Sequence, residues 1–152
     1  MKPPGPPIGR ELARSAKAVS QAFSTALARE GGSIPAWLIL SSLEENEWRS
    51  QRDLARAVGI EGPTLTRHLD GLERAGRVRR VPDPRDRRMQ RVEITDEGRA
   101  AQQRMLRAVI AFNRRLHAGL EEAELEQLRG LLRRLESNVA DAAQRDSPAA
   151  LR

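Results

Sequence analysis

Fifteen residues near the middle of the chain carry nearly all of its excess positive charge. From Arg77 to Arg91 there are seven arginines and two acidic residues, Asp83 and Asp86, which leaves five net positive charges. The whole chain has 27 Lys and Arg against 21 Asp and Glu, a formal net charge of +6. Because guanidinium groups are always charged and match the geometry of phosphate oxygens, so dense a cluster predicts a phosphate-binding surface. A solvated charged loop is the alternative interpretation.

The distribution of this charge is more informative than its total. Only Lys2 and Lys17 are lysines, and an excess of arginine and alanine often reflects the base composition of a genome. An isoelectric point near 11.2 is therefore weak evidence for a nucleic-acid partner by itself.

A second set of polar side chains precedes this cluster, at the start of a segment with helical spacing. Leucines at 65, 69 and 72 recur by steps of four and three, which predicts a helix that begins at Gly62-Pro63. The side chains that turn wholly or partly outward near its start are Pro63, Thr64, Thr66, Arg67 and His68. Hydroxyls and a helix N-terminus suit phosphate oxygens, and a long arginine reaches a base edge or a phosphate, so this surface fits a major groove. We expect His68 to be an auxiliary phosphate contact; an ordinary helical hairpin with a polar surface is the alternative.

Six helices and two strands are expected to position these side chains. Helical spacing of apolar residues predicts helices over 8–29, 34–45, 51–58, 62–75, 96–116 and 122–142. Ser33 and Ser50 are typical N-caps, and Gly59 and Gly76 are typical helix ends. Strands are expected over 78–81 and 91–94, joined by a turn-rich charged loop. Helices followed by such a hairpin have the element order of a winged helix-turn-helix.

The stretch from Trp37 to Gly98 resembles the MarR family of bacterial transcription regulators, and its SlyA branch most of all. The resemblance is carried by QRDLARAVGIEGPTLTRHLDGLERAGRVRR and by the wing sequence DPRDRRMQRVEITDEG. The wing is the more specific part, because Asp83-Pro84, Asp86-Arg87-Arg88, Thr95 and Gly98 match the family pattern. Ile94 replaces the usual leucine. Long flanking helices extend the similarity over nearly the whole chain except its proline-rich start.

The resemblance implies a homodimer whose terminal helices form a shared lobe. The fold class is then mainly α with a small β-hairpin (α+β), a winged helix-turn-helix plus a helical dimerisation lobe. The implied parts are a flexible tail (1–7), a lobe helix (8–32), the winged helix-turn-helix (33–98), the C-terminal lobe helices (99–145) and a second tail (146–152). Apolar residues assigned to the core or the interface of the lobe are Ile8, Leu12, Leu116, Leu120, Leu128, Leu131, Leu132, Leu135 and Val139.

The resemblance also implies how the dimer would meet DNA. Two recognition helices would enter successive major grooves of a palindromic operator, about 34–36 Å apart, with the wing tips over the flanking minor grooves. Arg88 is the best candidate for the side chain inserted there, Arg87 competes with it, and Arg85 is a further DNA contact. We expect Asp86 to orient its neighbours through an ion pair.

Many members of the family are released from DNA by small aromatic acids, which bind between the lobe and the winged domain. In this chain Phe23, Trp37 and Phe112 could line such a crevice, with Arg14 as a carboxylate partner. Packing of these aromatic rings into the core is the alternative. The chain has no cysteine, so release by thiol oxidation is excluded.

The composition argues against other classes of protein. There is no cysteine or tyrosine, His68 and His117 lie on different predicted helices, and phosphate-loop and H-E-x-x-H motifs are absent, so we expect no enzyme, metal or cofactor. The longest apolar run, residues 36–40, is far shorter than the roughly 20 residues that span a bilayer. The start lacks an apolar secretory signal, so we expect a cytoplasmic protein.

The sequence therefore predicts a sequence-specific regulator of transcription, a repressor that binds duplex DNA. The alternative is a winged-helix module used for protein or RNA contacts. A protein contact does not need five positive charges, and RNA binding by stacking favours aromatic residues, of which the basic hairpin has none.

Overall fold

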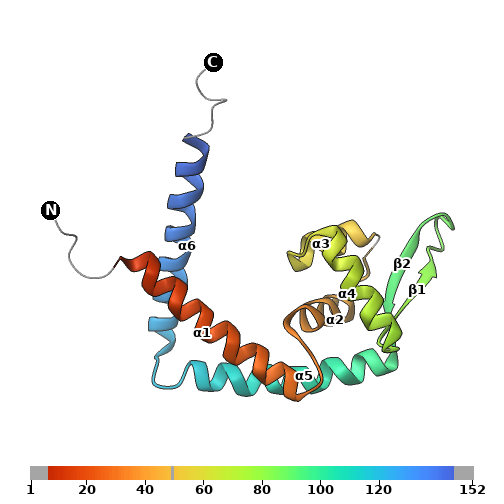
Figure 1. Cartoon of the computed structure of the whole chain (residues 1–152), viewed down its shortest axis with the longest axis horizontal. Helices are drawn as coiled ribbons and strands as arrows, with labels where there is room; N and C mark the ends of the chain where they lie inside the picture. Colours follow the sequence, from red (N-terminus) through yellow and green to blue (C-terminus); the bar gives the residue numbers. More distant parts are fainter. Residues whose placement is uncertain (1–6, 49, 146–152) are drawn as a thin grey trace. The chain divides into compact units, whose positions relative to one another are not determined.

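The computed structural model describes residues 7–48 and 50–145 of the chain. Its elements are α1 (Ile8–Arg29), α2 (Ile34–Glu45), α3 (Gln51–Val58), α4 (Gly62–Arg74), β1 (Val78–Pro82), β2 (Gln90–Ile94), α5 (Asp96–Leu116) and α6 (Glu122–Arg145) (Figure 1). The predicted order and type of the elements are confirmed. The predicted tails, 1–7 and 146–152, lie outside the described residues except for Pro7. The chain divides into two compact units, Met1–Phe112 and Asn113–Arg152.

Local capping explains where the central helices begin and end. The hydroxyl of Ser33 accepts the N–H of Ala36 at the start of α2, over 3.2 Å. At α3 the Ser50 hydroxyl accepts the N–H of Asp53 and donates to its carboxylate, 2.8 Å away. A glutamate at this position would reach back to the backbone N–H, but aspartate is one methylene shorter and binds the hydroxyl instead. Gly59 ends α3 with a φ of 67°, in the left-handed region that glycine adopts most readily.

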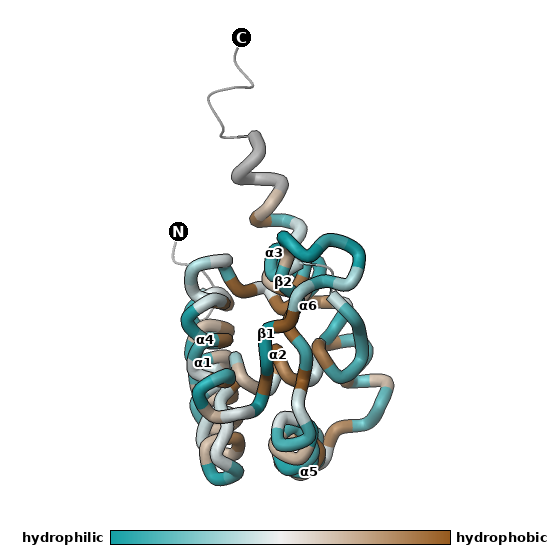
Figure 2. The backbone as a smooth tube through the Cα atoms, turned by 90° about the vertical axis from the view of Figure 1, so that its right-hand side faces the viewer, coloured by the Kyte–Doolittle hydropathy of each residue, from teal (hydrophilic) through white to brown (hydrophobic). Residues whose placement is uncertain are grey.

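The core lies among the end of α1, helices α2, α3 and α4, the hairpin and the first half of α5. Side chains with almost no exposed surface come from five helices of this unit: Leu27, Ile39, Leu40, Leu54, Leu65, Leu69 and Met105. Figure 2 shows the hydrophobic segments gathered at α2 and the base of the hairpin. Each buried leucine contributes roughly 1.5–3 kcal/mol to the free energy of folding. Burial of Leu65 and Leu69 therefore holds the inner face of α4 against the core.

The hairpin continues directly from α4 and is closed by α5. β1 and β2 are antiparallel, with Val78 opposite Ile94 and Pro82 opposite Gln90. At the base of the hairpin, Val78, Val92 and Ile94 are buried. A shift of one residue would expose them, so their burial sets the register. None of the residues at the tip of the hairpin, 83–89, is buried in this core.

The start of α5 packs very closely against the start of β1. The hydroxyl of Thr95 donates to the carbonyl of Gly76 over 2.6 Å, and accepts the N–H of Gly98 over 3.0 Å. A Cβ added to Gly98 would lie 2.0 Å from the carbonyl oxygen of Arg77 and 2.7 Å from the side chain of Ile94. Only glycine therefore allows the helix to approach the strand this closely.

We expect Gly98→Ala to destabilise the protein by roughly 1–3 kcal/mol, because the new methyl group must push away the backbone of Arg77, directly before β1. Gly71→Ala in α4 is the matched control, since a Cβ added there would meet nothing within 4 Å. Replacing glycine with alanine inside a helix should stabilise this control by up to about 1 kcal/mol. Urea unfolding followed by circular dichroism measures both. Equal stabilities for the two variants would contradict the close approach.

Candidate nucleic-acid interface

The outer surface of α4 has the exposure that its sequence predicts. Its inner residues Leu65, Leu69 and Leu72 are buried. The predicted contact residues of the first turns are all exposed or half-buried: Pro63, Thr64, Thr66 and Arg67 are exposed, and His68 is half-buried. The Thr66 hydroxyl donates its proton to the carbonyl of Gly62 over 3.1 Å, so it is left as an acceptor. The surface thus presents hydroxyl, imidazole and guanidinium groups at the start of one helix.

The tip of the hairpin is held in shape by two aspartates. The carboxylate of Asp83 accepts the N–H of Arg85 over 2.7 Å, and that of Asp86 accepts the N–H of Arg88 over 3.0 Å. The carbonyl of Asp86 also accepts the N–H of Met89, which makes Arg87 and Arg88 the central residues of a tight turn. Asp86 therefore orients its neighbour through the backbone; the ion pair expected from the sequence is absent from the interactions of the described residues.

The seven arginines between Arg77 and Arg91 divide into two groups. Arg79, Arg80 and Arg91, on the strands, form ion pairs with carboxylates of α4, β2 and the segment before α3. Arg77 donates to the carbonyl of Gly31 over 2.9 Å. The three arginines of the tip are exposed and form no ion pair within the described parts of the chain: Arg85, Arg87 and Arg88. The positive charge that no carboxylate pairs among the described residues is therefore at the tip and at Arg77, whereas the sequence alone treats all seven arginines as one cluster.

Arg80 ties the hairpin to α4. Its guanidinium donates to Asp70 over 2.6 Å and to Glu73, and its backbone N–H donates to Glu73 over 3.0 Å. The hydrogen bond to Asp70 contributes most to raising the pKa of Arg80 above its ordinary value, and those to Glu73 add to it. Both acidic residues lie on α4. This contact therefore fixes β1 against the helix that carries the outward polar side chains.

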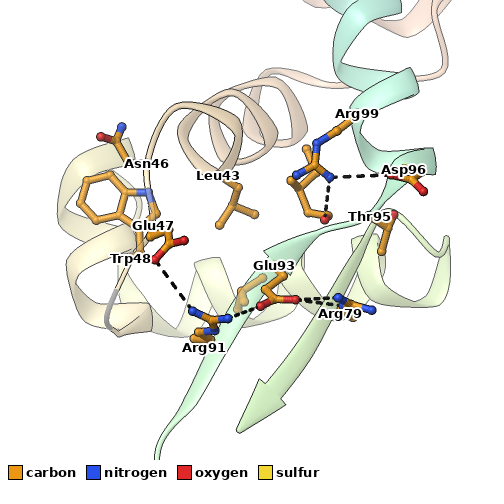
Figure 3. Close-up of a pocket in the computed structure, with 12 residues that line it drawn as sticks. Leu43, Asn46, Glu47, Trp48, Arg79, Arg91, Glu93, Thr95, Asp96 and Arg99 are labelled. Atoms are coloured by element: carbon orange, nitrogen blue, oxygen red, sulfur yellow. Dashed lines mark hydrogen bonds and ion pairs between the residues drawn. The ribbon is translucent and has the colours of Figure 1, made fainter. Parts of the chain in front are cut away.

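A cleft of about 430 Å³ lies at the base of the hairpin, beside the end of α2 and the start of α5. Figure 3 shows Glu93 between Arg79 and Arg91, which it binds over 2.9 Å and 2.5 Å. The hydrogen bond from Arg79 is the main cause of a lowered pKa at Glu93. Trp48 also lines the cleft, and its indole N–H donates to the carbonyl of Ser42 over 3.0 Å. Sequence reasoning missed this cleft; the alternation of Arg91 and Glu93 along β2 was its only signal.

The four residues suggested for a ligand pocket are only partly brought together. The rings of Phe23 and Phe112 lie 5.0 Å apart at an angle of 41°. Phe23 and Trp37 are partly buried and pack against the core. Arg14 is exposed on α1. Packing of aromatic rings into the core accounts for Phe23 and Trp37, and the assignment of all four residues to a ligand stays a prediction.

Two further properties concern metal ions and membranes. Within residues 7–48 and 50–145, no cluster of three or more His, Asp or Glu side chains is arranged to hold a metal ion. None of the helices in the described part of the chain is long and apolar enough to cross a membrane.

Three packed helices followed by a hairpin with a charged tip make up a winged helix-turn-helix, a class of fold found in many transcription regulators. The MarR family model matches residues 33–89. Many solved structures are similar over most of their length, among them the following three. The transcriptional regulator PA3341 is 31% identical, with a TM-score of 0.72, over 89% of this chain and 99% of that one. The chain belongs to the MarR family.

The other two structures are of the repressor CouR. CouR bound to a 23-mer DNA duplex is 28% identical, with a TM-score of 0.77, over 86% of this chain and 92% of that one. CouR from Rhodococcus jostii RHA1 bound to p-coumaroyl-CoA is 29% identical, with a TM-score of 0.72, over 84% and 90%. The similarity thus extends beyond the winged helix to the flanking helices.

We expect Arg80→Ala to lower the free energy of unfolding by about 1–2 kcal/mol, because it removes charged hydrogen bonds and leaves Asp70 beside Glu73. Arg79→Ala is the matched control from the adjacent position of β1. Its side chain is 67% exposed, against 19% for Arg80, so the loss of its ion pair should cost less than about 1 kcal/mol. Urea unfolding measures both variants. An equal cost for the two would show that Arg80 does not fix the hairpin.

Proposed function

We propose that this protein regulates transcription by binding a specific sequence in duplex DNA as a homodimer, and that it acts as a repressor. The observation that carries the proposal is the separation of charge within the hairpin. The strand arginines are paired with carboxylates, while Arg85, Arg87 and Arg88 are exposed at the tip without such partners among the described residues. Unpaired guanidinium groups on a preformed turn are suited to the negative potential of a DNA groove.

In this proposal α4 is the recognition helix and the hairpin is the wing. Arg67 reaches a base edge or a phosphate, and Pro63, Thr64, Thr66 and His68 complete the surface that enters the major groove. Arg88 enters the flanking minor groove, with Arg87 as the competing candidate and Arg85 as a further contact. Asp86 supports Arg88 through the backbone hydrogen bond described above. The complex of CouR with a DNA duplex supports this interpretation.

The exposed apolar residues of the terminal helices support a dimer. On α1, on the helices after the wing and in the turn that joins α5 to α6, large apolar side chains remain exposed in the single chain: Ile8, Leu12, Leu116, Leu120, Leu128, Leu131 and Val139. Leu132 and Leu135 are half-buried. Exposed apolar stripes of this length mark a protein interface. We therefore retain residues 8–32 and 99–145 as a shared lobe and residues 33–98 as the DNA-binding part.

The remaining parts of the proposal rest on the family. From the wing sequence we infer that the protein is a member of the SlyA-like branch. We also infer that it is located in the cytoplasm and that it functions by binding and not by catalysis. The aromatic acyl-CoA bound by CouR supports release from DNA by an aromatic ligand. Residues 14, 23, 37 and 112 are our candidates for contacting it.

Selection of bound sequences from a random duplex pool tests the function. We expect a palindrome whose half-sites are centred about one helical turn, roughly 34–36 Å, apart, because a two-fold dimer presents two α4 helices. Binding of RNA or single strands in preference to every duplex would favour the alternative, a winged helix used for RNA or protein contacts. A selected site without two-fold symmetry would contradict the dimer.

Arg88→Ala should weaken binding to the selected duplex by roughly 1–3 kcal/mol, because it removes a side chain that contacts the groove. The effect should be largest where the sequence under the wing is rich in A·T pairs, whose narrow minor groove attracts arginine. Arg104→Ala, which removes an arginine of α5 paired with Glu97, is the control and should bind like wild type. Fluorescence anisotropy at fixed salt measures both. If Arg87→Ala alone has the larger effect, Arg87 is the inserted residue.

A further inference from the structure

A second cleft, of about 300 Å³, lies where the turn between α1 and α2 meets α4. Its hollow exists because small residues face each other there, Gly31 and Gly32 on the turn and Gly71 and Ala75 on α4. Polar side chains stand around it: Ser33, Arg67, His68 and Arg77. Ser33 was not among the residues that the sequence suggested for DNA contacts, and Arg77 was included only as one of the seven arginines of the basic cluster.

The charge of this cleft is of one sign. No Asp or Glu is among the residues that line it, although 21 acidic residues occur in the chain. The nearest acidic residues along α4, Asp70 and Glu73, are bound to Arg80. An anion in the cleft would therefore meet two guanidinium groups without a competing carboxylate in its lining.

The two arginines have donors left for such an anion. One nitrogen of Arg77, Nη1, donates to the carbonyl of Gly31, which holds the guanidinium at the cleft. Its Nε and Nη2 make no hydrogen bond to another described residue, and the same holds for all three nitrogens of Arg67. A guanidinium anchored at one nitrogen keeps its remaining N–H groups in a fixed direction.

Ser33 adds a hydroxyl donor. Its oxygen accepts the N–H of Ala36 and so caps α2. The hydroxyl proton is donated to no acceptor within the described chain, so it is available to an oxygen in the cleft. Two guanidinium groups and one hydroxyl around a small hollow match the oxygens of a phosphate group.

We propose that this cleft binds a phosphate of the DNA backbone, which makes Arg67 a phosphate contact and adds the α1–α2 turn to the contacts of α4 and the wing. The proposal rests on the proposed function. It means that the α1–α2 turn contacts DNA, so that each subunit holds the duplex at three places. A free phosphate has the same chemistry, so a separate arm of the test addresses it.

The main test compares two variants of one residue. Asparagine and aspartate both cap helices well and are nearly equal in shape, so Ser33→Asn and Ser33→Asp should both fold. Only aspartate brings a negative charge into the cleft. We expect Ser33→Asp to bind the selected duplex roughly tenfold or more weakly than Ser33→Asn, and melting temperatures check that both are folded.

Arg77→Gln tests the second group, with Arg77→Lys as the conservative variant. In Arg77→Gln the plot of log affinity against log salt should become shallower by about 0.9 for each phosphate that is no longer neutralised, and lysine should restore most of the slope. Replacing single phosphates of the duplex by neutral methylphosphonates locates the phosphate that the cleft binds. One position should weaken wild type but leave Arg77→Gln unaffected. Equal affinities of the Ser33 variants, an unchanged salt slope and no such position would overturn the proposal.

Titration with inorganic phosphate distinguishes the two sources. If the amide signals of residues 31–33 shift with phosphate in Ser33→Asn but not in Ser33→Asp, while no backbone position depends on Arg77, the cleft takes free phosphate instead of DNA. Should wild type bind no duplex at all, the proposed function fails. Should it bind duplex with all these comparisons negative, only the phosphate cleft fails.

Discussion

The ionic contact between β1 and α4 fixes the hairpin relative to the helix that carries the outward polar side chains. Arg80 reaches back from the first strand to Asp70 and Glu73 on the helix, and Glu73 also accepts the backbone N–H of Arg80. Gly98 in turn lets α5 approach the backbone of Arg77, directly before the same strand. The hairpin is thus fixed at its base from two sides, while its tip extends beyond the core. A duplex has a fixed groove spacing, so a helix and a wing can use adjacent grooves only if their separation is equally fixed.

The partition of the arginines follows from this arrangement. The arginines of the two strands form ion pairs with neighbouring carboxylates, because a charge close to the core is destabilising without a partner of opposite charge. Glu93 binds two of them, Arg79 and Arg91, and its carboxylate is stabilised in the charged form as a result. The arginines of the tip are exposed to solvent, so they do not need a carboxylate partner to offset burial of their charge. A segment can therefore be basic in composition although only some of its arginines lack a carboxylate partner within the protein.

The sequence predicted the elements well because their boundaries depend on local chemistry. Ser33, Ser50 and Gly59 determine helix ends through hydrogen bonds and backbone conformation within four residues, so they can be recognised from the sequence alone. Partners distant in the sequence were not predictable. Arg77 and Gly31 are 46 positions apart, and the cleft between the α1–α2 turn and α4 is lined by residues of segments that are far apart in the sequence. The backbone hydrogen bond of Asp86 was not predictable either, because whether its carboxylate meets a guanidinium or a backbone N–H depends on the shape of the turn.

The two aspartates of the hairpin tip affect both the net charge and the rigidity of the loop. A carboxylate inside a cationic loop repels phosphate, yet Asp83 and Asp86 hold the backbone N–H groups of Arg85 and Arg88. An ordered turn loses less conformational entropy when it docks than a flexible one would. Neutralising either aspartate would raise the net charge of the loop and at the same time loosen it. The two aspartates therefore lower the net charge of the tip by two units while they hold its turn in shape.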